Sequence, residues 1–366
     1  MSVPQDPNND SIRHHLIPQV YMKAWGDNTS SKLRKSLKII DCTDKNNLIV
    51  KDDSTINVGV IDFYNSLKAG MPKLKQAVTD EMFEGLNSYS IVVEDEHVTH
   101  TQRMNELFGI FDEWIIKYKD HIINSDEKTA LKTTIQNQIN NTIETYFARG
   151  IENKWHHFRE NIKKVVATES HVPIFQKDLL LEMVVLTEHR SSKGNIVFEG
   201  MMKRIFSILE FDKIALPEDE RYMEGIESAE DELKHRLRQN NIEKHMYKDA
   251  DSLIQKMLDT LNDKQVRLHF IKGNSQYQQL FVTSDNPVIN TEESIFMPIT
   301  PYILCEIQKK VIVSRDSERY KIQEIIENKV NESNAVIVNS AKEFAILPFN
   351  HYESKPLNYK NLLSQS

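Results

Sequence analysis

Cysteine, glycine and proline are scarce in this chain, and each scarcity limits what the protein can be. The 366 residues include two cysteines, Cys42 and Cys305, so the sequence encodes neither a disulfide framework nor a cysteine-rich zinc site. The 10 glycines and 11 prolines leave few tight turns. Two thiols are typical of a protein from a reducing compartment.

Long apolar runs and established catalytic motifs are also lacking. No apolar run approaches the roughly 20 residues that a membrane-spanning helix needs, and the polar, acidic start carries no secretion signal. We therefore expect a soluble, cytoplasmic protein. The motifs GxxxxGK[ST], GxGxxG, HExxH and GxSxG are missing, which argues against a P-loop NTPase, a Rossmann enzyme, a zincin and an α/β-hydrolase.

The charge balance is acidic, with a formal net charge of -8 and 27% charged residues. Binding to a nucleic-acid backbone usually needs a basic face, so this balance argues against a protein that coats nucleic acid. The 46 lysines and arginines still allow local basic patches. An enzyme that acts on nucleic acid therefore stays open.

Helical periodicity dominates the middle of the chain. Apolar residues at three-four spacing predict a helix over 104–123. Further helices are expected at 127–168, 174–190, 196–212 and 226–262. We expect an α+β fold that is predominantly helical, with a small mixed or antiparallel sheet formed by the C-terminal strands. The expected layout is a disordered arm at 1–10, a single domain at 11–355 (core 11–65 and 265–355, helical insertion 72–262), and a loose tail at 356–366.

Short apolar runs predict strands near both ends of the chain. LKII (37–40) and LIVK (48–51) flank a polar turn and predict a hairpin that could join the C-terminal sheet. The runs at 266–273 and 279–282 predict a second antiparallel hairpin. Further strands are expected at 295–300, 302–307, 309–314 and 343–348, with a helix at 322–341.

The adjacent histidines His14 and His15 are the first candidate for chemistry. Neighbouring side chains on an extended segment point to opposite faces, so the two are not expected to bind one metal ion. One of them could act as a general base, a metal ligand or a phosphate contact, oriented by the amide of Gln19. The alternative is that the pair only fixes the start of the helix that Pro18 opens.

The turn Ser284-Asp285-Asn286-Pro287 is the second candidate, because it follows an apolar strand. A strand end holds a carboxylate rigidly, so Asp285 could bind a metal ion or accept a proton. The alternative is an Asx-turn that only caps the strand.

Two charged helix segments complete the candidates. Arg190 ends a predicted helix and could clamp a phosphate, or it could simply complement the helix dipole. The segment around His156 and His157, with Lys154 and Arg159, is expected to be a solvated helix face.

The motifs His-His-x-x-Pro-Gln-x-Tyr-x-Lys-x-Trp, DFY, a mid-chain helix ending in Arg, TSDNPV and MPITP occur in one order. This order resembles the bacterial family catalogued as domain of unknown function 4238, over nearly the whole chain. The matching residues are His14, His15, Pro18, Gln19, Trp25, Phe63, Tyr64, Arg190, Ser284, Asp285, Asn286, Pro287, Pro298, Pro301, Asn334 and Ala341. The family often has Arg-Thr-Pro where this chain has Arg190-Ser191-Ser192.

The resemblance implies that these distant polar residues meet at one site. The expected members are His14 or His15, Gln19, Arg190, Asp285 and Asn334, with Ser284 and Asn286 as further ligand contacts. Of the two histidines, His15 is expected to face Asp285, and Trp25 is expected to anchor the short helix beneath the site.

Two functions remain open. The first is a hydrolase of nucleic acid or a nucleotide, such as a toxin-like or phage-defence effector. In it, His14 or His15 activates water, Asp285 holds Mg²⁺ or Mn²⁺, and Arg190 stabilises developing charge. The opening motif is also similar to the start of some His-Asn-His nucleases. The second is a non-enzymatic regulatory module that binds a ligand, or binds a protein partner through the helical region.

Overall fold

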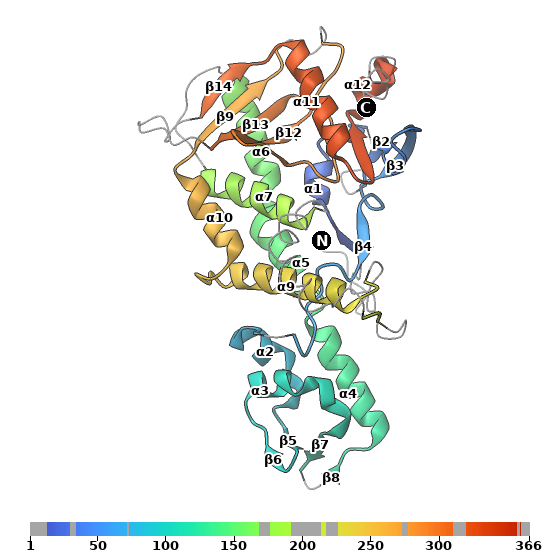
Figure 1. Ribbon diagram of the computed structural model, residues 1–366, viewed down its shortest axis with the longest axis vertical. Helices are drawn as coiled ribbons and strands as arrows, with labels where there is room; N and C mark the ends of the chain where they lie inside the picture. Colours follow the sequence, from blue (N-terminus) through green and yellow to red (C-terminus); the bar gives the residue numbers. More distant parts are fainter. Residues whose placement is uncertain are drawn as a thin grey trace. The chain divides into compact units, whose positions relative to one another are not determined.

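The computed structural model divides into two compact units, each with its own core (Figure 1). Unit 1 comprises residues 1–14, 61–147 and 204–255, and unit 2 comprises residues 15–60, 148–203 and 256–366. The residues that the structure describes are 13–29, 34–71, 73–119, 121–167, 176–191, 214–216, 226–272, 277–309, 320–356 and 359.

Unit 1 combines short helices with a small antiparallel sheet. Its strands run in the order β6-β5-β7-β8 and are β5 (Tyr89–Val93), β6 (Glu96–His97), β7 (Ile115–Tyr118) and β8 (His121–Ile122). Its helices are α2 (Gln76–Met82), η1 (Glu84–Leu86), α3 (Thr101–Glu106), η2 (Phe108–Glu113), α4 (Ser125–Gln138), α5 (Thr142–Tyr146) and α9 (Ala229–Met246).

The core of unit 1 contains a cluster of aromatic rings. Phe83, Phe108, Phe111 and Trp114 are buried and contact one another in tilted or edge-on pairs. Such pairs stabilise a core beyond the area they bury. The cluster joins α2, η2 and the start of β7, which explains how short elements form a stable unit.

Unit 2 is built on two sheets. The four-stranded sheet has the order β10-β15-β2-β3, and the five-stranded sheet has the order β11-β12-β13-β9-β14. The strands are β2 (Ser36–Asp41), β3 (Ile49–Ser54), β9 (Gln265–Phe270), β10 (Thr283–Ser284), β11 (Ile289–Asn290), β12 (Ser294–Thr300), β13 (Ile303–Gln308), β14 (Lys321–Glu324) and β15 (Phe344–Leu347). The helices are α1 (Gln19–Met22), α6 (Asn153–Ala167), α7 (Lys177–Arg190), α11 (Glu327–Ser340) and α12 (Phe349–Ser354).

Four further elements lie where the chain passes from one unit to the other. They are β1 (Arg13–His15), β4 (Val60–Asp62), η3 (Phe147–Glu152) and α10 (Leu253–Asn262).

The predicted N-terminal hairpin is confirmed. β2 pairs antiparallel with β3, and its other edge pairs with β15 near the end of the chain. The strands β12 and β13 are also confirmed, as an antiparallel pair. Both hairpins have short connections, for which local pattern is a reliable guide.

The second predicted hairpin is wrong, because its two strands lie in different sheets. β9 pairs with β13 and β14, whereas β10 pairs with β15. An apolar run indicates a strand but does not specify its partner. Because β14 runs parallel to β9 while the other pairs are antiparallel, the five-stranded sheet is mixed.

The prediction of a predominantly helical chain overstates the helix. The helix expected over 104–123 is instead the end of α3, the short η2 and strand β7. Ile110 has non-helical φ and ψ, and Ile116 pairs with Ile91 of β5. The β-branched residues of this stretch favour the strand once a neighbouring strand is present.

Some expectations concern residues outside the described part of the chain. These are the arm at 1–10, the helix at 196–212, nearly all of the strand at 309–314 and most of the tail at 356–366. Within the described residues, no helix combines the length and apolar character needed to cross a bilayer.

Candidate functional site

The N-terminal segment of unit 2 is anchored by two buried aromatic side chains. The hydroxyl of Tyr21 donates to the Pro298 carbonyl oxygen at 2.7 Å and lies 2.8 Å from Oγ1 of Thr283. The indole of Trp25 donates from Nε1 to the Phe281 carbonyl oxygen at 2.8 Å. These bonds hold α1 and the loop after it against strands about 260 residues later in the sequence.

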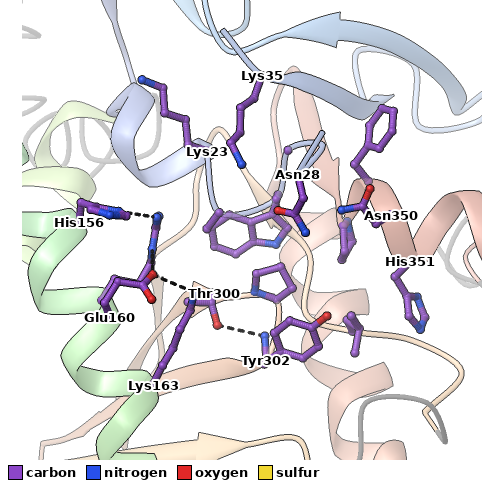
Figure 2. A pocket seen from close by; sticks show the side chains of 18 residues that line it. Lys23, Asn28, Lys35, His156, Glu160, Lys163, Thr300, Tyr302, Asn350 and His351 are labelled. Carbon is purple, nitrogen blue, oxygen red and sulfur yellow. Dashed lines mark hydrogen bonds and ion pairs between the residues drawn. The ribbon is translucent and has the colours of Figure 1, made fainter. Parts of the chain in front are cut away.

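A pocket of about 280 Å³ lies over this anchor, entirely within unit 2 (Figure 2). Its walls come from the segment after α1, from Lys35 before β2, from α6, from Leu280 before β10, from the β12–β13 turn and from the start of α12. We call it the basic pocket, because four of its lining side chains are cationic and one is a carboxylate. The cations are Lys23, Lys35, Arg159 and Lys163, and the carboxylate is Glu160.

Helix α6 supplies one wall of the basic pocket. Its buried residues Trp155, Phe158, Ile162 and Val166 recur at three-four spacing and fix the orientation of the helix. The same spacing places His156, Glu160 and Lys163 together along one side, as Figure 2 shows. The core pattern of α6 therefore aligns its polar residues into the pocket wall.

Arg159 is the buried member of the cluster, with 7% of its surface exposed. It donates from Nη1 to the Val20 carbonyl oxygen at 3.1 Å and from Nη2 to Nδ1 of His156 at 3.2 Å. A guanidinium can only donate, so Nδ1 of His156 accepts, and the neutral imidazole carries its proton on Nε2. Burial lowers the pKa of Arg159, and the charge of Glu160 partly opposes this.

Lys35 is brought to the pocket by a close approach of the backbone. A Cβ atom at Gly26 would lie 2.7 Å from Cβ of Lys35, so the residue at position 26 has no room for a side chain. The ammonium of Lys35 forms no hydrogen bond or ion pair with the described residues. Burial lowers the pKa of Lys35 first, followed by the positive charge of Arg159.

Lys23 is subject to the same two effects, burial and the charge of Arg159. Burial lowers the pKa of Lys23, and Arg159 lowers it further, although Glu152 acts in the opposite direction. Lys163 is paired with Glu160 at 2.9 Å, and this hydrogen bond holds the pKa of the Glu160 carboxyl below its usual range. Because Arg159 lowers the pKa of both Lys23 and Lys35, the cluster has a positive potential that an anion would relieve.

Arg190 contacts His15 through the main chain of the histidine. Arg190 is 2% exposed and donates from Nη2 to the His15 carbonyl oxygen and from Nη1 to Oε1 of Glu152 at 3.3 Å. The His15 ring donates from Nε2 to the Thr55 carbonyl oxygen at 3.2 Å. These bonds join the end of α7 to β1, which is a structural contact.

His14 belongs to unit 1 and is fully buried. Its Nδ1 accepts the backbone N–H of Asn65 at 2.7 Å, and the Asn65 amide donates to Oε1 of Glu144 at 2.5 Å. The two neighbouring histidines thus enter different hydrogen-bond networks, as expected for adjacent side chains on a strand.

The predicted turn at Ser284 fastens the end of α11. Both carboxylate oxygens of Asp285 accept from the backbone N–H of Lys342 at 3.0 and 3.1 Å, and Oδ2 also accepts from Glu343 at 2.8 Å. Asn286 donates to the Ser340 carbonyl oxygen at 3.1 Å, and its own N–H donates to Oγ of Ser284. No described hydrogen bond or ion pair joins Asp285 to His15 or Arg190.

Asn334 lies in the middle of α11 and holds the strand before that turn. Its Oδ1 accepts from Val282 N–H at 3.0 Å, and its Nδ2 donates to the Leu280 carbonyl oxygen at 2.8 Å. Gln19 is the first residue of α1, and its carbonyl oxygen accepts from Lys23 N–H. The expected common site of His15, Arg190, Asp285 and Asn334 therefore stays a prediction, since the described contacts divide these residues among separate networks.

The surroundings of Asp285 do not suit its expected role as a ligand of Mg²⁺ or Mn²⁺. Its two oxygens are occupied by backbone donors, and burial raises the pKa of the carboxyl to about 6. Among the described residues, no group of three or more His, Cys, Asp or Glu side chains is placed to hold a metal ion.

The sequence interpretation missed the basic pocket. The segment with His156 and Arg159 was expected to be a solvated face, which is wrong for the buried Arg159. The recurrence of polar residues at 156, 160 and 163 beside an apolar stripe was the available signal. Lys23 and Lys35 gave no such signal, because their approach depends on tertiary packing.

A family model with the description "Protein of unknown function (DUF4238)" matches residues 13–347. Neither the curated proteins nor the solved structures contain a match to this chain.

Replacing Asp285 with alanine tests the structural role of the turn. We expect Asp285→Ala to lower the free energy of unfolding by about 2–4 kcal/mol, because the backbone N–H groups of Lys342 and Glu343 lose a buried charged acceptor. The native carboxyl, with its pKa raised to about 6, binds its proton more tightly than the unfolded one. The stability that this tighter proton binding contributes is present at low pH and is lost as the pH rises through 6. The variant lacks it, so the difference in unfolding free energy between wild type and variant should be larger at pH 5 than at pH 7.5.

Urea unfolding at both pH values measures this effect. The matched control is Asp52→Ala, which removes an exposed carboxylate paired with Lys38 and should change stability by less than about 0.5 kcal/mol. Equal, small effects of the two substitutions would contradict the structural role of Asp285.

Proposed function

We propose that this chain, which belongs to the DUF4238 family of proteins of unknown function, binds the phosphate groups of a nucleotide or nucleic acid in its basic pocket and hydrolyses a phosphoester there. The observation that carries the proposal is the gathering of Lys23, Lys35, Arg159 and Lys163 around one pocket in a chain of net charge -8. Lys and Arg side chains are the usual protein partners of phosphate oxygens.

The state of these cations supports an anionic ligand. Lys35 has no described ion-pair partner, and its pKa is lowered by burial and by neighbouring positive charge. A bound phosphate would supply the missing counter-charge and restore the ordinary pKa. Arg159 is already fixed by Val20 and His156, so little side-chain freedom is lost when it contacts a ligand.

Hydrolysis would draw on two side chains of α6. The Nε2–H of His156 could hydrogen-bond to a leaving oxygen. Glu160, as an ionised carboxylate, could accept a proton from the attacking water and pass it to solvent, from which the leaving oxygen takes one. The cations would neutralise the charge that develops on the phosphoryl oxygens. A toxin-like or phage-defence role stays part of this proposal, because hydrolysis of nucleotides or nucleic acid is the activity such a role needs.

One observation favours the alternative, a non-enzymatic ligand-binding module. Nδ1 of His156 already accepts a hydrogen bond from Arg159, so this nitrogen cannot also take a proton from water. The described lining also includes no serine or cysteine that could act as a nucleophile. Binding without turnover would be the result in that case.

Charge removal inside the basic pocket should weaken anion binding. We expect Lys35→Gln to reduce the affinity for inorganic pyrophosphate about tenfold and Lys163→Gln somewhat less, since Lys163 is shared with Glu160. Isothermal titration calorimetry measures both. Lys164→Gln removes the same charge from an exposed position of α6 outside the lining and should change affinity less than about twofold. Equal effects of all three substitutions would show non-specific attraction and contradict the site.

Anion binding should also be linked to proton uptake at alkaline pH. The pKa of Lys35 is lowered in the free protein, and an anion raises it again, so protons bind together with the ligand as the pH approaches that lowered pKa. Sulfate is a suitable probe because it does not titrate there. Calorimetry in buffers of different ionisation enthalpy should show proton uptake at alkaline pH that is reduced in Lys35→Gln. Binding with no proton uptake would contradict the burial of this cation beside the ligand.

Turnover separates the hydrolase from the binding module. Purified protein is incubated with RNA, DNA and nucleotides, with and without Mg²⁺ or Mn²⁺. We expect His156→Ala and Glu160→Gln to lose most of the hydrolysis while retaining pyrophosphate affinity within about threefold, since the cations remain. If both variants keep full activity, the assigned chemistry is wrong, and if no substrate is cleaved although pyrophosphate binds, the binding module is the correct reading.

A further inference from the structure

The basic pocket has two chemically different sides. His156, Glu160 and Lys163 come from α6, and Figure 2 shows the amides of Asn28 and Asn350 on the opposite side. Both amides are exposed, and neither forms a hydrogen bond with the described residues. Tyr302, half-buried, lies below them as an aromatic face. A ligand that fills the pocket would meet cations at one end and uncharged amide and aromatic groups at the other.

The size of the pocket limits the ligand to a single small molecule. Its volume of about 280 Å³ lies just below the roughly 300–1,000 Å³ that small-molecule sites occupy. Proteins that hold single-stranded nucleic acid spread their contacts over roughly 4–16 nucleotides per binding fold. A pocket of this size suits one nucleotide better than a strand.

The charge of the pocket also favours a free nucleotide over a strand. Four cations against one carboxylate leave an excess of three positive charges. An internal phosphodiester brings one negative charge, whereas a terminal phosphate group brings about two, and a diphosphate more. A ligand with a terminal diphosphate therefore matches the cluster far better than an internal linkage does.

We infer that the basic pocket takes a free nucleoside diphosphate, with its phosphates on Lys35, Arg159 and Lys163 and its base against Asn28, Asn350 and Tyr302. This inference rests on the proposed function, which assigns phosphate binding to the same pocket, and adds the identity of the ligand class.

Each end has the chemistry that its part of the ligand needs. Arg159 and Lys35 present hydrogen-bond donors to phosphate oxygens from two different segments. An asparagine amide carries both donors and an acceptor, so it can match the polar edge of a base, and an aromatic ring offers a stacking surface to its face. Two amides, one from the loop after α1 and one from the start of α12, can read the edge from two directions.

The experiment compares the two ends independently. Affinities of the wild-type protein are measured by calorimetry for ADP, GDP, CDP and UDP, for inorganic pyrophosphate, and for a short single-stranded oligodeoxynucleotide without terminal phosphates. The same ligands are titrated into Asn350→Ala, Asn28→Ala and Lys35→Gln. Asn47→Ala is the matched control, since Asn47 is an exposed asparagine of unit 2 in the β2–β3 turn, outside the lining.

We expect at least one nucleoside diphosphate to bind about tenfold more tightly than pyrophosphate and than the oligonucleotide. Asn350→Ala should lower that nucleotide's affinity about fivefold and leave pyrophosphate affinity within about twofold, with a smaller effect of Asn28→Ala in the same direction. Lys35→Gln should weaken nucleotide and pyrophosphate alike, and Asn47→Ala should change neither.

Two results would overturn the inference while the proposed function stands. In the first, pyrophosphate binds in a Lys35-dependent manner and no nucleoside diphosphate binds more tightly. In the second, the oligonucleotide binds more tightly than every diphosphate, which would assign the pocket to a polymer. Binding of all probes without dependence on Lys35, or no binding of any of them, would overturn the proposed function together with the inference.

Discussion

The hydrogen bonds of Tyr21 and Trp25 with the C-terminal strands are the constraint on which the basic pocket depends. They fix α1 and the following loop on the sheet side of unit 2, and they use every polar atom of two large buried rings. From that position, Val20 presents its carbonyl oxygen to Arg159, and the backbone after Gly26 brings Lys35 near. Without this anchor, Lys23 after α1, Lys35 before β2 and the cations of α6 would not converge.

Such a cluster of cations opposes folding. Burial lowers the pKa of Lys23, Lys35 and Arg159, and the charge of Arg159 lowers the pKa of the two lysines further, so each charge is held at a cost in free energy. One carboxylate, Glu160, is too little to balance them. Unbalanced charge of this kind is typical of functional sites, where a bound ligand supplies the missing counter-charge.

The sequence predicts those parts of the fold that depend on local pattern. The hairpin of β2 and β3, the pair β12 and β13, and the helix that ends at Arg190 all follow from short-range alternation or periodicity. The predicted anchoring role of Trp25 is confirmed by its burial and its bond to Phe281. The assignment of β9 and β10 to one hairpin failed because the pairing partner of a strand is decided over long range.

The polar residues of the family pattern did not by themselves indicate where the pocket lies. Asp285, Asn286 and Asn334 proved to hold backbone groups around α11, a role that leaves the same residue types in the sequence as a catalytic role does. Arg159 was judged from its helix alone, which could not reveal that Val20 lies over it. The basic pocket is assembled from segments far apart in the sequence, so only their packing makes it visible.

A crystal structure of the protein with ADP or another nucleoside diphosphate tests the central claim most directly. The phosphate groups are predicted to lie in the basic pocket, within hydrogen-bond distance of Lys35 and Arg159, with the base toward Asn350. A nucleotide bound elsewhere on the protein while the basic pocket holds none would contradict the claim that this pocket is the phosphate site.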